Sequence, residues 1–153
     1  AWYATAVNTL ASLGMVSGDA NGNYRPNDPI TRAEFCVIAL AFAYEPDNAV
    51  CYFSDVSRSD WFYTYVAQAA SYGWIGGYTN GNFGPNDRIT RAQVTTIVNN
   101  MLGRAADRDY VDDYQDELVQ FTDLSRGHWA YYQIMEATNA HDYTKRSGTE
   151  NWR

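Results

Sequence analysis

The stretch GYTNGNFGPNDRITRAQ, residues 77–93, joins a turn-forming segment to the start of a helix. A closely similar stretch, GDANGNYRPNDPITRAE, occupies residues 18–34, and the two are separated by 77 − 18 = 59 positions. A long motif that recurs at a fixed spacing is the signature of a repeat protein. The sequence therefore predicts that the chain is built from copies of one structural unit.

Each copy carries two local signals. The Asn-Gly dipeptides at 21–22 and 80–81 predict tight turns, because both residue types tolerate positive φ. The pattern Thr-x-x-Glu or Thr-x-x-Gln, at Thr31 and Thr90, matches the capping box that satisfies the first N–H groups of a helix. A helix is expected to begin directly after each of these threonines.

Arg32 and Arg91 fall at the first position of these two helices, where the helix dipole disfavours a cation by up to ~1 kcal/mol. One interpretation is a solvated arginine, or one paired with a carboxylate such as Asp28 or Asp87. The other is an anion-binding site formed by the arginine and the unpaired N–H groups of the helix. Taken alone, the residues favour the first interpretation, because exposed arginines are common.

The composition limits the class of protein. With 46% hydrophobic and 16% aromatic residues, the 153-residue chain is expected to fold as one domain rather than to be disordered. Its net charge of −7 argues against a nucleic-acid partner. No apolar run approaches the ~18 residues that span a membrane, so membrane insertion is not expected. The chain shows no signal peptide and opens within a motif, which suggests a fragment of a longer, exported protein.

Neither a disulfide framework nor a metal site is predicted. Cys36 and Cys51 are interpreted as two buried thiols rather than as a disulfide, since two cysteines do not form a framework. The segments at 19–23 and 104–119 lack the glycine at the sixth position and the closing glutamate of a calcium loop. We therefore expect no metal and no cofactor.

Apolar periodicity predicts five helices. The first covers residues 2–13, and the second follows Thr31. The third covers residues 61–72 with Asp60 as its N-cap, the fourth lies between Thr90 and Gly103, and the fifth begins at Trp129. The expected organisation is a single domain, 1–153, with repeat 1 at 1–46, repeat 2 at 51–103, an acidic connector or helix at 104–119 and a partial repeat 3 at 120–153. Repeat 3 lacks the Asn-Gly turn and a second helix.

The sequence Ile-Thr-Arg-Ala-Glu after an Asn-Gly turn resembles the S-layer homology module. A second landmark of that family is Phe-x-Asp-Val followed by a tryptophan that opens a helix. It occurs at 53–56 with Trp61 and, with leucine in place of valine, at 121–124 with Trp129. The resemblance covers nearly the whole chain. It implies a mainly α fold, a pseudo-threefold spindle of three central helices with outer helices and long Gly/Asn/Pro loops.

The resemblance also implies a function. Members of this family are non-catalytic modules that anchor proteins to the outside of the cell, in the cell wall or S-layer. They bind secondary cell-wall polysaccharides, including pyruvylated ones, and in some relatives peptidoglycan. The family's grooves combine the arginine of one repeat with the aspartate and tryptophan of the next. Carried over, this implies Arg32, Asp55 and Trp61 in groove one, Arg91, Asp123 and Trp129 in groove two, and backbone donors near Gly77.

The chemistry of these residues suits such a ligand, because arginine binds a carboxylate bidentately and an indole packs on a sugar ring. The residues themselves also allow purely structural roles, in which Trp61 and Trp129 belong to the core and Asp55 and Asp123 cap turns. An enzyme is the rival class, but no motif pairs a nucleophile with a base. A third class is a structural module for self-assembly whose grooves are degenerate.

Overall fold

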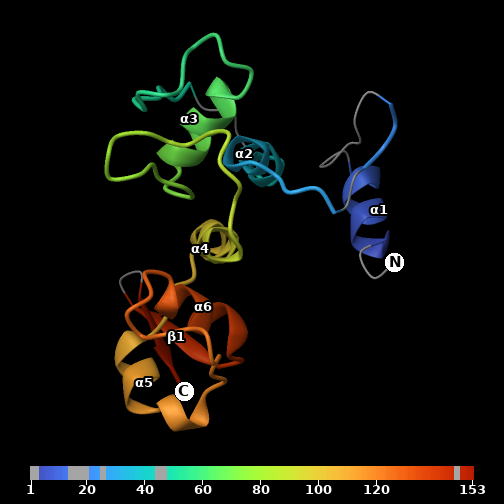
Figure 1. Cartoon of the computed structure of the whole chain (residues 1–153). Helices are drawn as coiled ribbons and strands as arrows, with labels where there is room; N and C mark the ends of the chain where they lie inside the picture. The colour runs from blue at the N-terminus through green and yellow to red at the C-terminus, as the bar shows by residue number, and fades with distance from the viewer. Residues whose placement is uncertain (1–3, 14–20, 25–26, 44–47, 147–148) are drawn as a thin grey trace. The chain divides into compact units, whose positions relative to one another are not determined.

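The computed structural model describes residues 4–13, 21–24, 27–43, 48–146 and 149–153. The chain is mainly helical, which confirms the predicted class, while the pseudo-threefold arrangement stays a prediction (Figure 1). The elements in chain order are α1 Ala4–Ser12, α2 Arg32–Leu40, α3 Tyr63–Ser71, α4 Arg91–Leu102, α5 Arg108–Asp113, the 3-10 helix η1 Gln115–Glu117, α6 Tyr131–Thr138, β1 Tyr143–Arg146 and β2 Thr149–Trp152.

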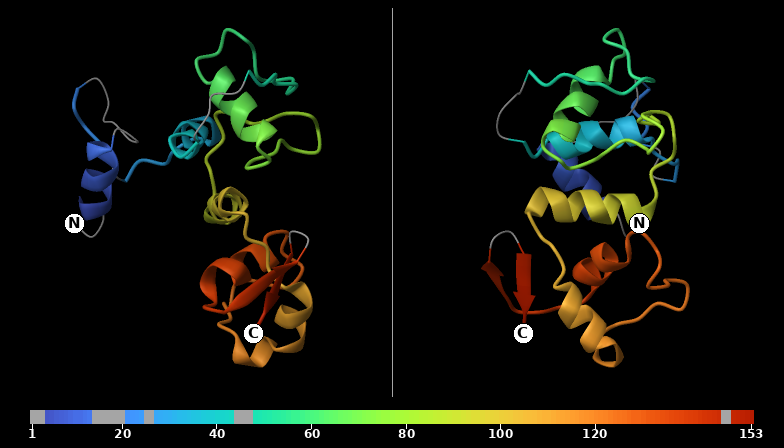
Figure 2. Two further views of the ribbon diagram at one scale, coloured as in Figure 1. Left: turned by 180° about the vertical axis from the view of Figure 1, so that it is seen from behind. Right: turned by 90° about the vertical axis from the view of Figure 1, so that its left-hand side faces the viewer.

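The chain forms two compact units, which are described separately. Unit one comprises residues 1–72 and 76–89, and unit two comprises residues 73–75 and 90–153. In unit one α2 packs against α3, and in unit two α4 and α5 pack against α6 (Figures 1 and 2). Each unit thus pairs the second helix of one repeat with the first helix of the next.

The capping boxes form as predicted. The Thr31 hydroxyl accepts from the Glu34 N–H at 3.2 Å while the Glu34 carboxylate accepts from the Thr31 N–H at 2.7 Å. Thr90 and Gln93 exchange the same two bonds, at 3.2 and 3.0 Å. Two satisfied donors at each start explain why α2 and α4 begin where the sequence indicates.

The glycines predicted at turns and helix ends adopt positive φ where they are described. Gly22 and Gly81, in the two Asn-Gly turns, have φ of 78° and 85°. Gly73 follows α3 with φ of 69°, and Gly103 caps α4 in the left-handed region with φ of 62°. Gly14, predicted to end the first helix, lies outside the described residues.

The predicted start of α3 is wrong. The helix begins at Tyr63 rather than Trp61, and its N-cap is Phe62, which makes no side-chain capping bond. Asp60 does not cap the helix, because its carboxylate accepts from the Ser57 N–H at 2.7 Å and closes a turn before it. Trp61 therefore stands in the turn that precedes α3.

The core of unit one joins small and branched residues of α2 and α3. Buried side chains on α2 include Ala33, Cys36 and Ala39, and those on α3 include Val66 and Ala69. Cys36 and Cys51 are both free thiols, as expected, although Cys51 is only half-buried.

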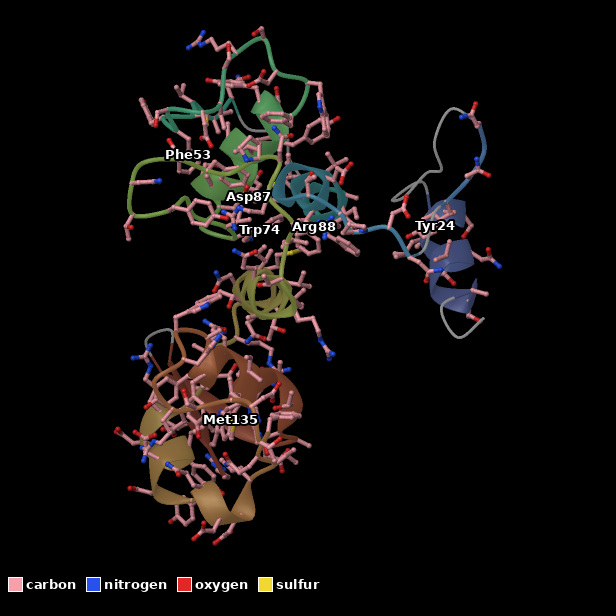
Figure 3. All side chains as sticks on the ribbon, in the orientation of Figure 1. Tyr24, Phe53, Trp74, Asp87, Arg88 and Met135 are labelled. Atoms are coloured by element: carbon pink, nitrogen blue, oxygen red, sulfur yellow. The ribbon has the colours of Figure 1, made fainter. Side chains whose placement is uncertain are left out.

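The acidic connector contains a helix that helps to build the core of unit two. Asp107 caps α5 through its carboxylate, which accepts from the Tyr110 N–H at 3.1 Å. Val111 of α5 is fully buried in one cluster with Tyr131 and Met135 of α6. Figure 3 labels Met135 within this unit. The acidic residues thus lie on the outside of a packed helix.

The C-terminal residues form a hairpin that the sequence analysis did not predict. Strands β1 and β2 pair antiparallel, with Tyr143 opposite Trp152 (Figure 2). Trp152 is only 5% exposed and joins the cluster of Val111, Tyr131 and Met135. Successive side chains of a strand point to opposite faces, so the mostly polar strand β2 can still direct Trp152 into the core.

Candidate functional site

Arg32 holds the loop of the second repeat from within unit one. Its side chain is buried, with only 3% of the residue exposed. Nε donates to the Phe83 carbonyl at 2.8 Å, and Nη2 donates to the Gly76 carbonyl at 2.7 Å. The guanidinium also lies over the rings of Tyr78 and Phe83, at 4.7 and 4.6 Å from their centroids. Arg32 is therefore a buried cation that organises loop 76–84.

The first N–H groups of α2 donate to backbone carbonyls that lie just after loop 76–84. The N–H of Arg32 donates to the Asp87 carbonyl at 2.9 Å, and the N–H of Ala33 donates to the Pro85 carbonyl at 3.1 Å. The first N–H groups of a helix are the ones that an anion would use. At α2 these two N–H groups are already hydrogen-bonded to the protein's own backbone carbonyls.

Asp55 holds the loop from the other side. One carboxylate oxygen accepts from the Phe83 N–H at 2.7 Å and the other from the Gly84 N–H at 2.8 Å. Partial burial alone would raise the pKa of Asp55, but these two bonds and the charge of Arg32 outweigh it and lower the pKa. Arg32 and Asp55 thus bind the carbonyl and the N–H of the same residue, Phe83.

Gly77 lies where the loop touches the Phe-x-Asp-Val segment. A Cβ there would stand 2.7 Å from the Asn82 carbonyl oxygen and 2.8 Å from a ring carbon of Phe53. The backbone needs this close approach because the Tyr78 N–H donates to the same Asn82 carbonyl at 2.7 Å. Glycine is therefore required at position 77 by packing, independently of any ligand.

Trp61 and Trp129 are surface residues. Each is 63% exposed, whereas Trp152 is 5% exposed. Among the aromatic ring pairs of the described residues, Trp61 pairs with its neighbour Phe62, and Trp129 pairs with its neighbour His128. The alternative that these two tryptophans belong to the core is therefore wrong.

Arg91 and Asp123 occupy the equivalent positions of the next repeat, in unit two. Both are exposed, and neither side chain makes a hydrogen bond or ion pair with another described residue. The Arg91 and Ala92 N–H groups at the start of α4 also have no partner within the described ranges. These N–H groups lack a described partner because repeat 3 has no counterpart of residues 76–87, the segment whose carbonyls accept from the N–H groups of α2.

The structure therefore gives the predicted residues two different settings. Site one, in unit one, consists of Arg32, Asp55, Trp61 and Gly77. Here Arg32 and Asp55 meet at Phe83, while no hydrogen bond or ring contact within the described parts joins Trp61 to them. Site two, in unit two, consists of Arg91, Asp123 and Trp129, and no contact links these three side chains to one another in the described ranges.

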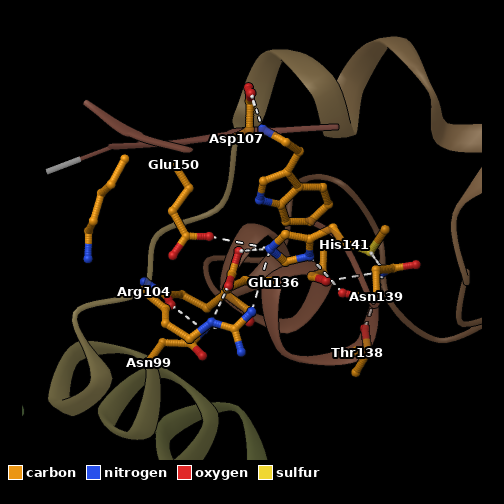
Figure 4. Close-up of polar contacts among 12 residues, drawn as sticks. Asn99, Arg104, Asp107, Glu136, Thr138, Asn139, His141 and Glu150 are labelled. Carbon is orange, nitrogen blue, oxygen red and sulfur yellow. Dashed lines mark hydrogen bonds and ion pairs between the residues drawn. The ribbon is translucent and has the colours of Figure 1, made fainter. Parts of the chain in front are cut away.

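One buried polar cluster in unit two was not singled out from the sequence. Glu136 of α6, Glu150 of β2 and His141 between them converge, with Arg104 beside Glu136 (Figure 4). A signal did exist, because His141 stands 141 − 73 = 68 positions after the helix-ending Gly73. Trp129 follows Trp61 by the same spacing. His141 therefore stands where repeat 2 has its helix-ending glycine, and this substitution indicates a different local structure.

Across the described ranges, no helix has both the length and the apolar character needed to cross a membrane. This finding concerns the helices of this chain alone.

Comparison with known proteins identifies the family. The model of the S-layer homology domain matches residues 1–36 and 52–95, which is 36 + 44 = 80 of the 153 residues. An amylopullulanase from Thermoanaerobacterium thermosulfurigenes is 36% identical over 111 residues, covering 68% of this chain and 6% of that protein.

Two proteins of Acetivibrio thermocellus match over 93% of this chain. Cell surface glycoprotein 1 is 28% identical over 6% of its own length, and a cellulosome-anchoring protein is 27% identical over 31% of its length. The chain thus spans a minor part of each of these relatives. By the family match and the similarity to the amylopullulanase, the chain belongs to the S-layer homology domain family.

Proposed function

We propose that this chain is a non-catalytic anchor that binds an anionic secondary cell-wall polysaccharide through arginine, aspartate and tryptophan. Its family and its surface-protein relatives point to an extracellular location in the cell wall. The observation that carries the proposal is the exposure of Trp61 and Trp129, each 63% open to solvent at the same position of successive repeats. Tryptophan is enriched at interfaces, because its ring is apolar and its N–H is polar, and an indole face suits a sugar ring.

Site two supplies the chemistry for an acidic sugar. Arg91 offers a guanidinium that no described residue uses, next to the unpaired N–H groups of Arg91 and Ala92 at the start of α4. A helix N-terminus beside an arginine favours a carboxylate, such as that of a pyruvyl ketal. In this proposal Asp123, whose carboxylate is exposed, accepts hydrogen bonds from sugar hydroxyls.

Site one uses the same residue types differently. We propose that Arg32, Asp55 and Gly77 shape loop 76–84, and that Trp61 and the backbone of this loop face the polymer. The buried guanidinium and the closed N-terminus of α2 support this division of roles. The acidic group of the ligand is accordingly assigned to site two.

The relatives include an enzyme, but the chain corresponds to only 6% of that protein. In our proposal any catalytic activity belongs to other domains of a longer protein, and this chain supplies attachment. The alternatives are direct binding to peptidoglycan and a purely structural role in self-assembly.

The proposal is tested by cosedimentation of the chain with wall sacculi from its source organism, before and after hydrofluoric acid extraction of secondary polymers. Sedimentation that disappears on extraction is the expected result. Sedimentation that survives extraction would indicate peptidoglycan as the ligand, and no sedimentation at all would favour the structural role.

Arg91→Ala separates recognition of the acidic group from general charge. It is expected to reduce sedimentation strongly, whereas Arg58→Ala, which removes an equally positive exposed side chain from another position, is expected to have little effect. Equal losses in both variants would contradict a specific role for site two.

A further inference from the structure

The side chains of Glu136, His141 and Glu150 form a buried cluster of potential metal ligands in unit two. Those of Glu136 and Glu150 are 0% exposed, and that of His141 is 4% exposed. One ligand atom from each residue lies within 4.8 Å of the others. Charged carboxylates are rarely buried unless they are paired or coordinate a metal.

The histidine presents its Nε2 atom to the two carboxylates. Its Nδ1 lies 2.8 Å from the Asn139 carbonyl oxygen, which can only accept, so Nδ1 carries a proton. In the neutral imidazole, the Nε2 lone pair therefore faces Glu136 and Glu150 (Figure 4). A backbone carbonyl that fixes the tautomer in this way is a common support of metal-binding histidines.

The imidazole is also held in place by packing. The ring of Trp152 stacks on His141, with 3.8 Å between the ring centroids and an interplanar angle of 16°. On the other side, Arg104 Nε lies 2.7 Å from Glu136 Oε1, which leaves Oε2 directed at the histidine. Arg104 also reaches the histidine, because its Nη2 lies 3.5 Å from His141 Nε2, a contact that a bound cation would replace.

The distances suit a shared cation better than direct hydrogen bonds. Nε2 of His141 lies 3.3 Å from Glu150 Oε2 and 3.6 Å from Glu136 Oε2. A charge-assisted N–H···O bond is ~2.7 to 2.9 Å long. Ligands of tetrahedral zinc, at ~2.0 to 2.2 Å from the metal, stand about 3.3 to 3.5 Å apart. The two separations that involve His141 are close to those between ligands of a coordinated ion, and the ligand atoms of all three residues lie within 4.8 Å of one another.

The polar atoms of the cluster also lack compensation. Within the described chain, Glu150 Oε1 and both carboxylate oxygens of Glu136 are buried without a hydrogen bond, and Glu136 has an ion pair with Arg104 at 2.7 Å. Two carboxylates against one guanidinium leave an uncompensated negative charge.

We propose that Glu136, His141 and Glu150 bind one divalent transition-metal ion, with the chemistry of Zn²⁺. One imidazole and two carboxylates are ligands that zinc accepts, and the buried Glu150 Oε1 or a water completes the shell. Glu150 also lines a surface depression of about 470 Å³ together with Asp107, Arg108 and Asp109. The ion joins β2 to α6 and so secures the C-terminal hairpin.

The test is zinc binding by the whole, untagged chain after treatment with a chelator, followed by equilibrium dialysis and calorimetric titration. The expected result is one Zn²⁺ per chain and an increase in melting temperature on addition of zinc. Co²⁺ in place of zinc is expected to give the visible absorption of a tetrahedral site, a readout that needs no variant.

Matched variants locate the ion. Glu150→Gln and His141→Gln are expected to weaken zinc binding by roughly 100-fold or more. His128→Gln removes the other histidine and Asp116→Asn removes an exposed carboxylate of the same unit, and both should bind zinc as the parent does.

Failure of the folded parent chain to bind zinc would overturn the proposal, as would unchanged affinity in a folded Glu150→Gln variant. In the first case, an imidazolium at His141, seen by ¹⁵N NMR, would show that a proton supplies the missing positive charge. Neither result would bear on attachment to the cell wall, which sacculus binding measures independently.

Discussion

At the scale of single residues, Arg32 and Arg91 show how one sequence motif acquires two roles. Both are the first residue of a capped helix, yet Arg32 is 3% exposed and bonded to loop carbonyls while Arg91 is exposed. The difference arises because loop 76–87 exists after repeat 1 and has no counterpart after repeat 2. Arg32 therefore has a structural role, whereas Arg91 is exposed and could contact a ligand.

Replacing these arginines should therefore affect stability unequally. Arg32→Ala removes two buried charge-assisted hydrogen bonds and is expected to lower the free energy of unfolding by about 2 to 4 kcal/mol. Arg91→Ala should change it by less than about 0.5 kcal/mol. Urea unfolding followed by circular dichroism measures both, and equal effects would show that the two side chains do not differ as described.

Asp55 and Asp123 form a second matched pair. Asp55→Asn is expected to cost about 1 to 2 kcal/mol at pH 7, because the charged acceptor of the Phe83 and Gly84 N–H groups is lost. Asp123→Asn, at the equivalent position without a described partner, should leave stability unchanged. Comparable destabilisation by both variants would contradict this assignment.

The pH dependence follows from the lowered pKa of Asp55. Burial opposes this lowering, and the hydrogen bonds to Phe83 and Gly84 prevail. A depressed folded-state pKa contributes stability that is present above the unfolded value of about 3.9 and is lost as the pH falls through the folded value. Unfolding curves between pH 7 and pH 2 should therefore show the Asp55→Asn penalty shrinking in acid, and a penalty that grows would have the wrong sign.

The two cysteines should differ in reactivity. Burial raises the pKa of Cys36 to about 12, against a smaller opposing effect of Arg32, whereas Cys51 is half-buried. Because the thiolate is the reactive form, iodoacetamide at pH 8 should alkylate Cys51 first. Peptide mass spectrometry over time measures this order, and faster labelling of Cys36 in the folded chain would refute it.

At the scale of elements, helix starts and turns could be predicted because their causes are local. Thr31 and Thr90 bond to residues three positions away, and Gly22 and Gly81 satisfy the backbone of their own turns. The start of α3 was misplaced because Asp60 has a competing local partner, the Ser57 N–H. Capping patterns identify a helix start only when no other turn uses the same carboxylate.

What the sequence could not supply were contacts between distant residues. The burial of Arg32 depends on Gly76 and Phe83, which are 44 and 51 positions away. The hairpin at 143–152 has the turn dipeptide Ser147-Gly148 in its sequence, but its place depends on Trp152 entering a core made by α5 and α6. Neither arrangement has a periodicity that a single sequence reveals.

The contact between loop 76–84 and the segment at Phe53 gives a prediction at this scale. Gly77→Ala places a methyl group against the Asn82 carbonyl and the Phe53 ring, and should destabilise unit one by about 1 to 3 kcal/mol. Gly76→Ala is the matched control, since nothing lies within 4 Å of a Cβ at that position. Thermal unfolding of both variants decides between a packing requirement and a general loss of glycine flexibility.

At the scale of the whole molecule, the two units present the same kind of surface feature. Each carries one tryptophan that is 63% exposed, at the turn before the first helix of a repeat. Two sites on one chain can bind a repeating polymer jointly and raise the overall affinity above that of either site. Loss of one tryptophan should therefore weaken attachment, and loss of both should abolish it.

The most direct measurement is the fraction of chain that sediments with intact sacculi for the Trp61→Ala/Trp129→Ala double variant. Leu102→Ala is the control, because it removes an apolar side chain with the same 63% exposure from outside both sites. Anchoring through the exposed tryptophans predicts that the double variant stays in solution while Leu102→Ala sediments like the parent chain. Undiminished sedimentation of a folded double variant would contradict it.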